Sequence, residues 1–118
     1  ENLVYARSKL VHAGASAGLD VIDVPYLDLE NMDGMKKEAE LVRNLGFTGK
    51  GSIHPKQIKI LNQVFTPPED EILKAKKILE QFNNSNTGLV VIDGKLIEKP
   101  VLREMQRKIL IADKINKN

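Results

Sequence analysis

The sequence predicts an α/β fold in which short parallel strands alternate with helices, and three observations support this prediction. Two short strand-like runs, residues 21–26 and 49–54, are each followed by a helical pattern. Glycines stand where predicted helices end, and prolines stand where others begin. The resulting order of helix, strand, helix, strand, helix is that of successive βα units, whose strands run parallel because a helix connects them.

The first helix and strand occupy the start of the chain. Apolar and small residues recur at helical spacing over residues 2–17, and Gly18 follows where a left-handed C-cap is expected. Residues 21–26 are rich in β-forming residues and are bounded by acidic ones, so we predict a buried strand that ends at Pro25.

The next helix ends at Gly46. Its inward stripe is predicted to be Met35, Ala39, Val42 and Leu45. Residues 49–54 form the second strand, and Pro55 opens a helix that buries Ile58 and Leu61.

A further helix is predicted over residues 67–82. Thr66, Pro67 and Glu69 have the spacing of a capping box, with threonine as N-cap and proline at the first helical position. The predicted buried residues of this helix are Ile72, Ala75, Leu79 and Phe82.

The chain ends with a hairpin and a helix. Asp93-Gly94, which favours a two-residue turn, lies between the strands 89–92 and 95–98. Pro100 starts the last helix, whose predicted apolar face is Val101, Leu102, Met105, Ile109 and Ala112.

Two parallel strands cannot cover their own faces. A (β/α)₈ barrel needs about 250 residues, so we predict that this chain of 118 residues holds the C-terminal part of one. Residues 1–82 would be the last βα units, and residues 83–118 a hairpin and helix extension. The strands should then pack against protein outside the chain, through Val21, Ile22, Val24 and Ile53.

Composition excludes several classes of partner. The net charge of +2 arises from mixed acidic and basic residues without a basic block, which argues against nucleic acid. No apolar run reaches the roughly 20 residues that span a bilayer, so we expect a protein that is not bound to a membrane, with the cytoplasm as the default location. Glu1-Asn2-Leu3 is neither an initiator methionine nor the basic start of a signal peptide, so we expect the numbering to begin inside a longer chain. The absence of cysteine excludes disulfides and thiolate metal sites.

A series of segments occurs in a fixed order along the chain: Tyr5-Ala6-Arg7-Ser8, Ile22-Asp23-Val24-Pro25-Tyr26, Leu45-Gly46-Phe47-Thr48-Gly49-Lys50 followed by Ile53-His54-Pro55-Lys56-Gln57-Ile58, then Phe65-Thr66-Pro67 and Gly94-Lys95-Leu96-Ile97-Glu98-Lys99-Pro100. In this order and spacing they resemble the citrate lyase beta subunit and citramalyl-CoA lyase branch of the HpcH/HpaI aldolase family. The resemblance covers essentially the whole chain.

The resemblance implies a magnesium-dependent carbon–carbon lyase. Such an enzyme cleaves a 3-hydroxyacyl thioester of coenzyme A or acyl-carrier protein, such as citramalyl-CoA, malyl-CoA or a citryl thioester, into an acyl thioester and a 2-oxo acid. The family's metal-binding Glu and Asp lie on strands that precede this segment, so no metal ligand is expected in the chain. A homo-oligomer, trimeric or hexameric, is expected.

The resemblance also assigns roles to four residues. Glu98 takes the acidic position of the family's Ile-acid-x-Pro motif, usually an aspartate, and would deliver a proton to the enolate in the active site of a neighbouring subunit. Ser52 and Ile53 would offer backbone groups to the substrate's carboxylate, and His54 would contact substrate. Structural alternatives are a helix-start charge for Glu98 and a partner of the following helix for His54.

Four other polar residues are expected to be structural. Asp23 is either a pocket acid or a buried hydrogen-bonding residue that fixes the strand end, and we favour the second. Arg7 is expected to bind carboxylates on the outside of the barrel, with His12 facing the same way. Lys50 is expected at a solvated strand end, although it could also neutralise a phosphate.

Two other functions remain as alternatives. One is an aldolase of the same family that acts on free 2-oxo acids, and the other is a non-catalytic binding or assembly module. The motif around Glu98 favours the thioester lyase over the aldolase. The module remains open because the chain lacks a complete metal site.

Overall fold

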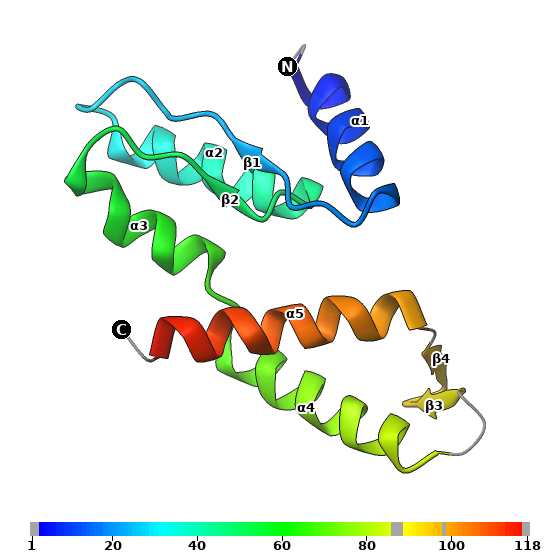
Figure 1. The fold of residues 1–118 in the computed structure, drawn as a ribbon. Helices are drawn as coiled ribbons and strands as arrows, with labels where there is room; N and C mark the ends of the chain where they lie inside the picture. Colours follow the sequence, from blue (N-terminus) through cyan, green and yellow to red (C-terminus); the bar gives the residue numbers. More distant parts are fainter. Residues whose placement is uncertain (1–2, 86–88, 98, 117–118) are drawn as a thin grey trace. The chain divides into compact units, whose positions relative to one another are not determined.

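The structure, a computed structural model, describes residues 3–85, 89–97 and 99–116 (Figure 1). The chain divides into two compact units, Glu1–Phe65 and Thr66–Asn118, which are described separately. In chain order the elements are α1 (Leu3–Ser16), β1 (Ile22–Asp23), α2 (Met32–Leu45), β2 (Gly49–Lys50), α3 (Pro55–Phe65), α4 (Glu69–Asn83), β3 (Val90–Ile92), β4 (Lys95–Ile97) and α5 (Lys99–Asn116).

The N-terminal unit contains the predicted pair of parallel strands. Ile22 lies opposite Gly49, and Asp23 lies opposite Lys50. The α2 helix connects the two strands, so the predicted βαβ connection is confirmed. This arrangement places the loops after β1 and β2 at the same edge of the pair.

Both strands are shorter than predicted. The ladder ends after Asp23 and Lys50, and the segment up to His54 is a loop rather than strand. One reason is that Pro25 has no N–H to continue the ladder. The last bond beyond the strands runs from the Gly51 N–H to the Asp23 carbonyl at 2.9 Å.

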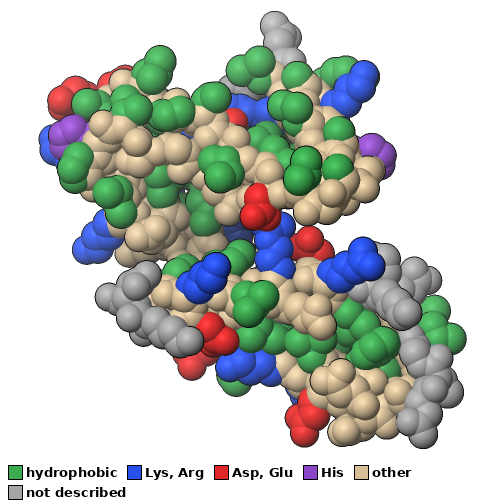
Figure 2. Space-filling view, viewed as in Figure 1, with side chains coloured by type: hydrophobic (Ala, Val, Ile, Leu, Met, Phe, Trp, Pro, Cys, Tyr) green, Lys and Arg blue, Asp and Glu red, His purple; other side chains and the backbone are tan. Residues whose placement is uncertain are grey.

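The apolar residues around these strands are largely uncovered. Ile22 is 67% exposed, Val24 is 65% exposed and Ile53 is 50% exposed. Figure 2 shows hydrophobic side chains spread over the surface of this unit. Val21, the fourth residue named in the prediction, is half-buried, and the packing of all four against protein outside the chain stays a prediction.

The core of the N-terminal unit lies between α2 and α3. Met35 and Ala39 of α2 pack with Leu61 and Val64 of α3, and Tyr26 packs against their edge. Met35, Ala39 and Val42 are all fully buried, which confirms most of the predicted stripe of α2.

Both ends of α2 carry specific caps. The Asn31 side chain accepts a hydrogen bond from the Gly34 N–H at 2.9 Å. Gly46 ends the helix with a φ of 109°, a left-handed conformation that favours glycine, as predicted.

The C-terminal unit pairs α4 with α5 and carries the hairpin. The hairpin β3–β4 is confirmed, and Asp93 and Gly94 both have positive φ, as a type I′ turn requires. Buried residues of this unit include Ala75, Ile78 and Leu102. The predicted division into residues 1–82 and 83–118 concerns membership of a barrel and stays a prediction.

The start of α4 differs from the prediction. The helix begins at Glu69 with Pro68 in the cap position and no side-chain cap, so Thr66 is not its N-cap. A proline disfavours the helical conformation of the residue before it, which keeps Pro67 out of the helix. Three acidic residues in the first turn favour the helix start instead: Glu69, Asp70 and Glu71.

None of the helices within the described ranges is both long enough and apolar enough to cross a membrane.

Candidate functional site

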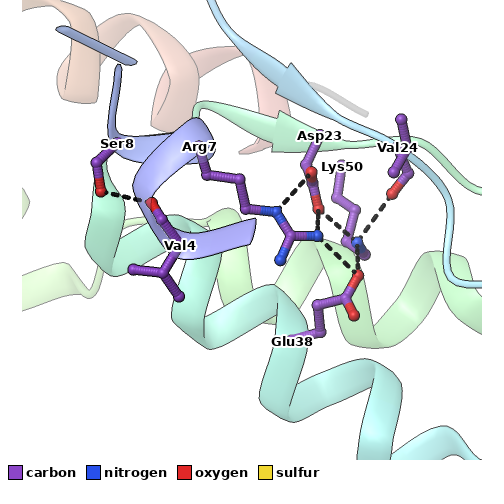
Figure 3. A network of polar contacts seen from close by, with 7 residues as sticks. All are labelled: Val4, Arg7, Ser8, Asp23, Val24, Glu38 and Lys50. Carbon is purple, nitrogen blue, oxygen red and sulfur yellow. Dashed lines mark hydrogen bonds and ion pairs between the residues drawn. The ribbon is translucent and has the colours of Figure 1, made fainter. Parts of the chain in front are cut away.

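Four charged side chains from four elements meet beneath the ends of β1 and β2 (Figure 3). Arg7 comes from α1, Asp23 from β1, Glu38 from α2 and Lys50 from β2. The Arg7 Nε lies 3.3 Å from Asp23 Oδ1, and its Nη2 lies 3.4 Å from Glu38 Oε1. Two cations and two carboxylates thus balance in one cluster, buried except for the half-buried Glu38, which we call the charge cluster.

Lys50 lies at the centre of the charge cluster. Its ammonium lies 2.6 Å from Asp23 Oδ2 and 2.6 Å from Glu38 Oε1, and it also donates to the Val24 carbonyl at 2.8 Å. All three donor positions of the ammonium are therefore used. The expectation of a solvated strand end was wrong, because these acceptors bury the Lys50 side chain completely, with 0% exposure.

Asp23 has the structural role favoured from sequence, and Arg7 binds carboxylates as expected, while its predicted position on the outside of a barrel stays a prediction. Asp23 is buried and accepts hydrogen bonds from both Arg7 and Lys50. The same bonds hold α1, which buries only Arg7 and Gly14, against the rest of the unit. The charge cluster therefore fixes the strand ends, and its carboxylates are already neutralised by protein cations.

The described residues do not offer a magnesium site. No group of three or more Asp, Glu or His side chains in the described part of the chain could hold a metal ion. Asp23 and Glu38, which do lie together, are bonded to Arg7 and Lys50 instead.

The predicted substrate-contacting residues form a single loop after β2. Ser52 and Ile53 are exposed, and His54 is half-buried just before α3. These three residues, called the 52–54 loop, lie at the carboxyl end of a parallel strand, where α/β barrels bind their substrates. Glu98 lies outside the described residues, so its relation to this loop stays a prediction.

His54 has the local bond expected of its structural alternative. Its Nδ1 accepts a hydrogen bond from the Lys56 N–H at 3.1 Å, within the first turn of α3. This bond places the neutral ring's proton on Nε2. The second nitrogen is the atom left for any contact with substrate.

Gln57 is the residue that sequence reasoning missed. Its side chain is fully buried, whereas Ile58, which was predicted to be inside, is 49% exposed. Leu61 is buried as predicted, and Gln57 and Val64 rather than Ile58 complete the inward face of α3. The spacing of these three residues, four and then three apart, was the signal in the sequence.

The Gln57 amide connects the loops that follow the two strands. Its Nε2 donates to the Tyr26 carbonyl at 2.8 Å, on the β1 side. Its Oε1 accepts from the Ile53 N–H at 3.0 Å and lies 3.2 Å from the Ser52 hydroxyl, on the β2 side. The Ile53 N–H is consequently engaged inside the protein rather than directed at a ligand.

A family model described as a C–C bond lyase of the TIM-barrel fold matches residues 10–115. This range contains Asp23, Lys50, the 52–54 loop and the hairpin, and it omits Arg7.

Curated relatives match most of the chain. The citrate lyase subunit beta of Leuconostoc mesenteroides subsp. cremoris is 32% identical over 96% of the chain, and the mitochondrial citramalyl-CoA lyase of Rattus norvegicus is 31% identical over 98%. A (3S)-malyl-CoA thioesterase of Cereibacter sphaeroides is 37% identical over 73% of the chain. The chain spans only 38%, 35% and 31% of these three proteins, respectively.

Solved structures show the same fold. The CitE protein of Mycobacterium tuberculosis, crystallised with magnesium, acetoacetate and coenzyme A, superposes with a TM-score of 0.75 at 23% identity over 96% of this chain and 42% of its own. RipC from Yersinia pestis superposes with a TM-score of 0.60 at 40% identity, over 61% of this chain and 34% of its own.

Proposed function

Because the chain belongs to the C–C bond lyase family of the TIM-barrel fold, we propose that it is part of an enzyme that cleaves a carbon–carbon bond in a 3-hydroxyacyl thioester. The products are an acyl thioester and a 2-oxo acid. The observation that carries this proposal is the family match over residues 10–115, which includes both strand ends and the loop that follows β2.

The substrate class follows from the relatives. Their names specify citrate, citramalyl-CoA and (3S)-malyl-CoA, whose acyl groups all carry a hydroxyl and a carboxylate. We propose a coenzyme A or acyl-carrier-protein thioester of this kind, such as citramalyl-CoA, malyl-CoA or a citryl thioester. The thioester stabilises the enolate that leaves when the bond breaks.

Magnesium belongs to this proposal, and its ligands are proposed to lie outside the described residues. The two carboxylates that lie together, on Asp23 and Glu38, are saturated by Arg7 and Lys50. We propose that strands outside this chain supply the metal ligands, while the chain's own residues bind substrate and move a proton.

The 52–54 loop is proposed to hold the substrate. Its position after β2, the exposure of Ser52 and Ile53, and the engagement of Gln57 beneath it give a fixed surface at the strand ends. Since the Ile53 N–H is already bonded to Gln57, the groups left for substrate are the remaining polar atoms of the loop and His54 Nε2.

Glu98 is proposed as the proton donor to the enolate, acting at the site of a neighbouring subunit in a homo-oligomer, trimeric or hexameric. The support is its place in the motif Ile97-Glu98-Lys99-Pro100, of which Ile97 ends β4 and Lys99 begins α5. Because Glu is one methylene longer than the family's Asp, the donor would reach slightly further, and geometry at this scale affects rates.

The test compares the polypeptide that carries the complete barrel with the 118-residue chain alone. Citramalyl-CoA, malyl-CoA and a citryl thioester are supplied with magnesium, and both the 2-oxo acid and free coenzyme A are measured. Formation of a 2-oxo acid without free coenzyme A, by the complete barrel only, is the expected result.

Other outcomes of this assay point to other functions. Free coenzyme A without a 2-oxo acid would indicate a thioesterase, as in the Cereibacter sphaeroides relative. Cleavage of free 2-oxo acids with no thioester reaction would indicate an aldolase. No turnover of any of these substrates by the complete barrel would refute the proposed function, and turnover by the chain alone would refute the assignment of the metal ligands.

A further inference from the structure

Gln57 has the environment of a residue that holds two loops at a fixed separation. It is 0% exposed, and it contacts the half-buried Tyr26 on one side and the exposed residues Ser52 and Ile53 on the other. A buried amide is stable only when its polar atoms are paired, and here both ends of the amide have partners. Those partners belong to the segments that follow two neighbouring parallel strands, β1 and β2.

We infer that Gln57 is a positioning residue for the substrate site: it sets the distance between the Tyr26 segment and the 52–54 loop, and thereby the affinity for substrate. This inference rests on the proposed function only in taking the 52–54 loop as a substrate-binding surface.

Two other contacts show that the separation of these loops is tightly determined. The Gly51 N–H donates to the Asp23 carbonyl at 2.9 Å, and a Cβ added at Gly51 would lie 3.0 Å from Pro25 Cγ. The segments therefore touch just before the point where Gln57 bridges them. Gln57 extends this contact beyond the last ladder bond, where Pro25 has no N–H to donate.

The two ends of the amide have opposite requirements, which makes the test specific. The end facing Tyr26 must donate a hydrogen, and the end facing Ile53 must accept one. A neutral carboxyl group satisfies both requirements, whereas an ionised carboxylate can only accept and repels the Tyr26 carbonyl. Gln57→Glu should therefore behave like wild type when the introduced carboxyl is protonated and lose the bridge when it ionises. Burial raises the pKa of such a carboxyl, which moves this change toward neutral pH.

The experiment measures KM and kcat of the complete barrel enzyme for its thioester substrate from about pH 5 to about pH 8, a range around the raised carboxyl pKa. Gln57→Glu is compared with Gln57→Met, which removes both bonds at every pH. Gln63→Glu is the matched control, because Gln63 is an exposed residue of the same helix. Charged or titratable side chains beside the bridge include those of Tyr26, His54 and Lys56, and the wild-type enzyme measured over the same pH range controls for them.

At about pH 8, Gln57→Glu should raise KM about three- to tenfold, which is the effect of one ordinary hydrogen bond, with kcat within about twofold. KM should return toward the wild-type value as the pH falls, while Gln57→Met should stay impaired throughout. A purely structural role would not give this recovery of KM at low pH.

If the KM of Gln57→Glu equals the KM of Gln63→Glu at every pH, the inference is overturned. If Gln57→Glu does not fold at about pH 8, it is measured at about pH 5, where the neutral carboxyl restores both bonds. A KM there no better than that of Gln57→Met would also overturn it.

Amide hydrogen exchange of Ile53 in the 118-residue chain separates this inference from the proposed function. Faster exchange in Gln57→Met than in Gln63→Glu supports the bridge, because the Ile53 N–H loses its acceptor. Unchanged exchange overturns it. If the complete barrel has no lyase activity, the proposed function is refuted. The exchange rate of the Ile53 amide then still tests whether Gln57 holds the loop in place.

Discussion

Replacing Lys50 with methionine tests how strongly the charge cluster stabilises the N-terminal unit. The ammonium is fully buried and lies 2.6 Å from carboxylate oxygens of both Asp23 and Glu38. Without it, the Asp23 carboxylate, whose side chain is 5% exposed, retains only the longer bonds from Arg7 at 3.3 and 3.4 Å. Glu38, at 24% exposure, reaches water more easily, so most of the cost arises at Asp23.

The expected loss is about 3–5 kcal/mol in the free energy of unfolding, since removing one partner leaves a buried charge without compensation. With a urea slope of about 1 kcal/mol per molar for a unit of this size, the midpoint of unfolding should fall by roughly 3 M or more. Lys36→Met is the control, because the Lys36–Glu40 pair is 4.0 Å apart and about half exposed. Its loss should be about 0.3–0.5 kcal/mol.

The double variant Lys50→Met with Asp23→Asn identifies the cause. Neutralising Asp23 removes the uncompensated charge, so the double variant should be more stable than the sum of the single changes predicts, by about 1–3 kcal/mol. Urea titration followed by circular dichroism gives all values, and a series in trimethylamine N-oxide measures any variant that is unfolded in buffer. A Lys50→Met midpoint indistinguishable from that of Lys36→Met would refute this account of the cluster.

Three further predictions concern the motif residue, the loop and the exposed face. In the complete barrel enzyme, Glu98→Gln should lower kcat about 10²- to 10⁴-fold with little change in KM, while Glu98→Asp should keep much of the activity. A wild-type kcat for Glu98→Gln, with the chemical step shown to be rate-limiting, would show that Glu98 does not donate the proton. Gly51→Ala should lower the free energy of unfolding, measured by urea titration, by about 1–3 kcal/mol, because the added methyl would lie 3.0 Å from the rigid Pro25 ring. An unchanged midpoint of unfolding would mean that the two loops separate easily. Ile22→Thr should change the stability of the 118-residue chain by less than about 0.5 kcal/mol, since Ile22 is 67% exposed, but should cost about 1.5 kcal/mol or more in the complete barrel. Equal effects in both proteins would contradict a partial barrel.

Local signals in the sequence predicted the elements well, while contacts between elements were harder to foresee. Gly46 and the Asp93-Gly94 turn were identified correctly because positive φ requires particular residue types at those positions. The start of α4 was predicted too early, because the capping-box pattern of Thr66 to Glu69 does not include the effect of Pro68 on the backbone conformation of the preceding residue, Pro67.

The candidate site was predicted only in part. Arg7 and Asp23 were assigned their structural roles from residue type and position, whereas Lys50 was expected in solvent. Its burial depends on Glu38, which is 12 residues away on another element, and no local pattern reports such a pairing. The spacing of Gln57, Leu61 and Val64 could have placed Gln57 on the inward face of α3, but its partners, Tyr26 and Ile53, lie on other segments and no local pattern reports those bonds.

The charge cluster also has a consequence for how the N-terminal unit folds. Its four members are spread from residue 7 to residue 50 and come from four different elements. No single βα unit contains a balanced set, so a half-formed intermediate would carry unpaired charges in its interior, at a cost of several kcal/mol for each. The cluster therefore disfavours partly folded states and makes α1, β1, α2 and β2 form together. Because these contacts are distant in sequence, their late formation should also slow folding, and hydrogen exchange in the four elements should report a single opening energy.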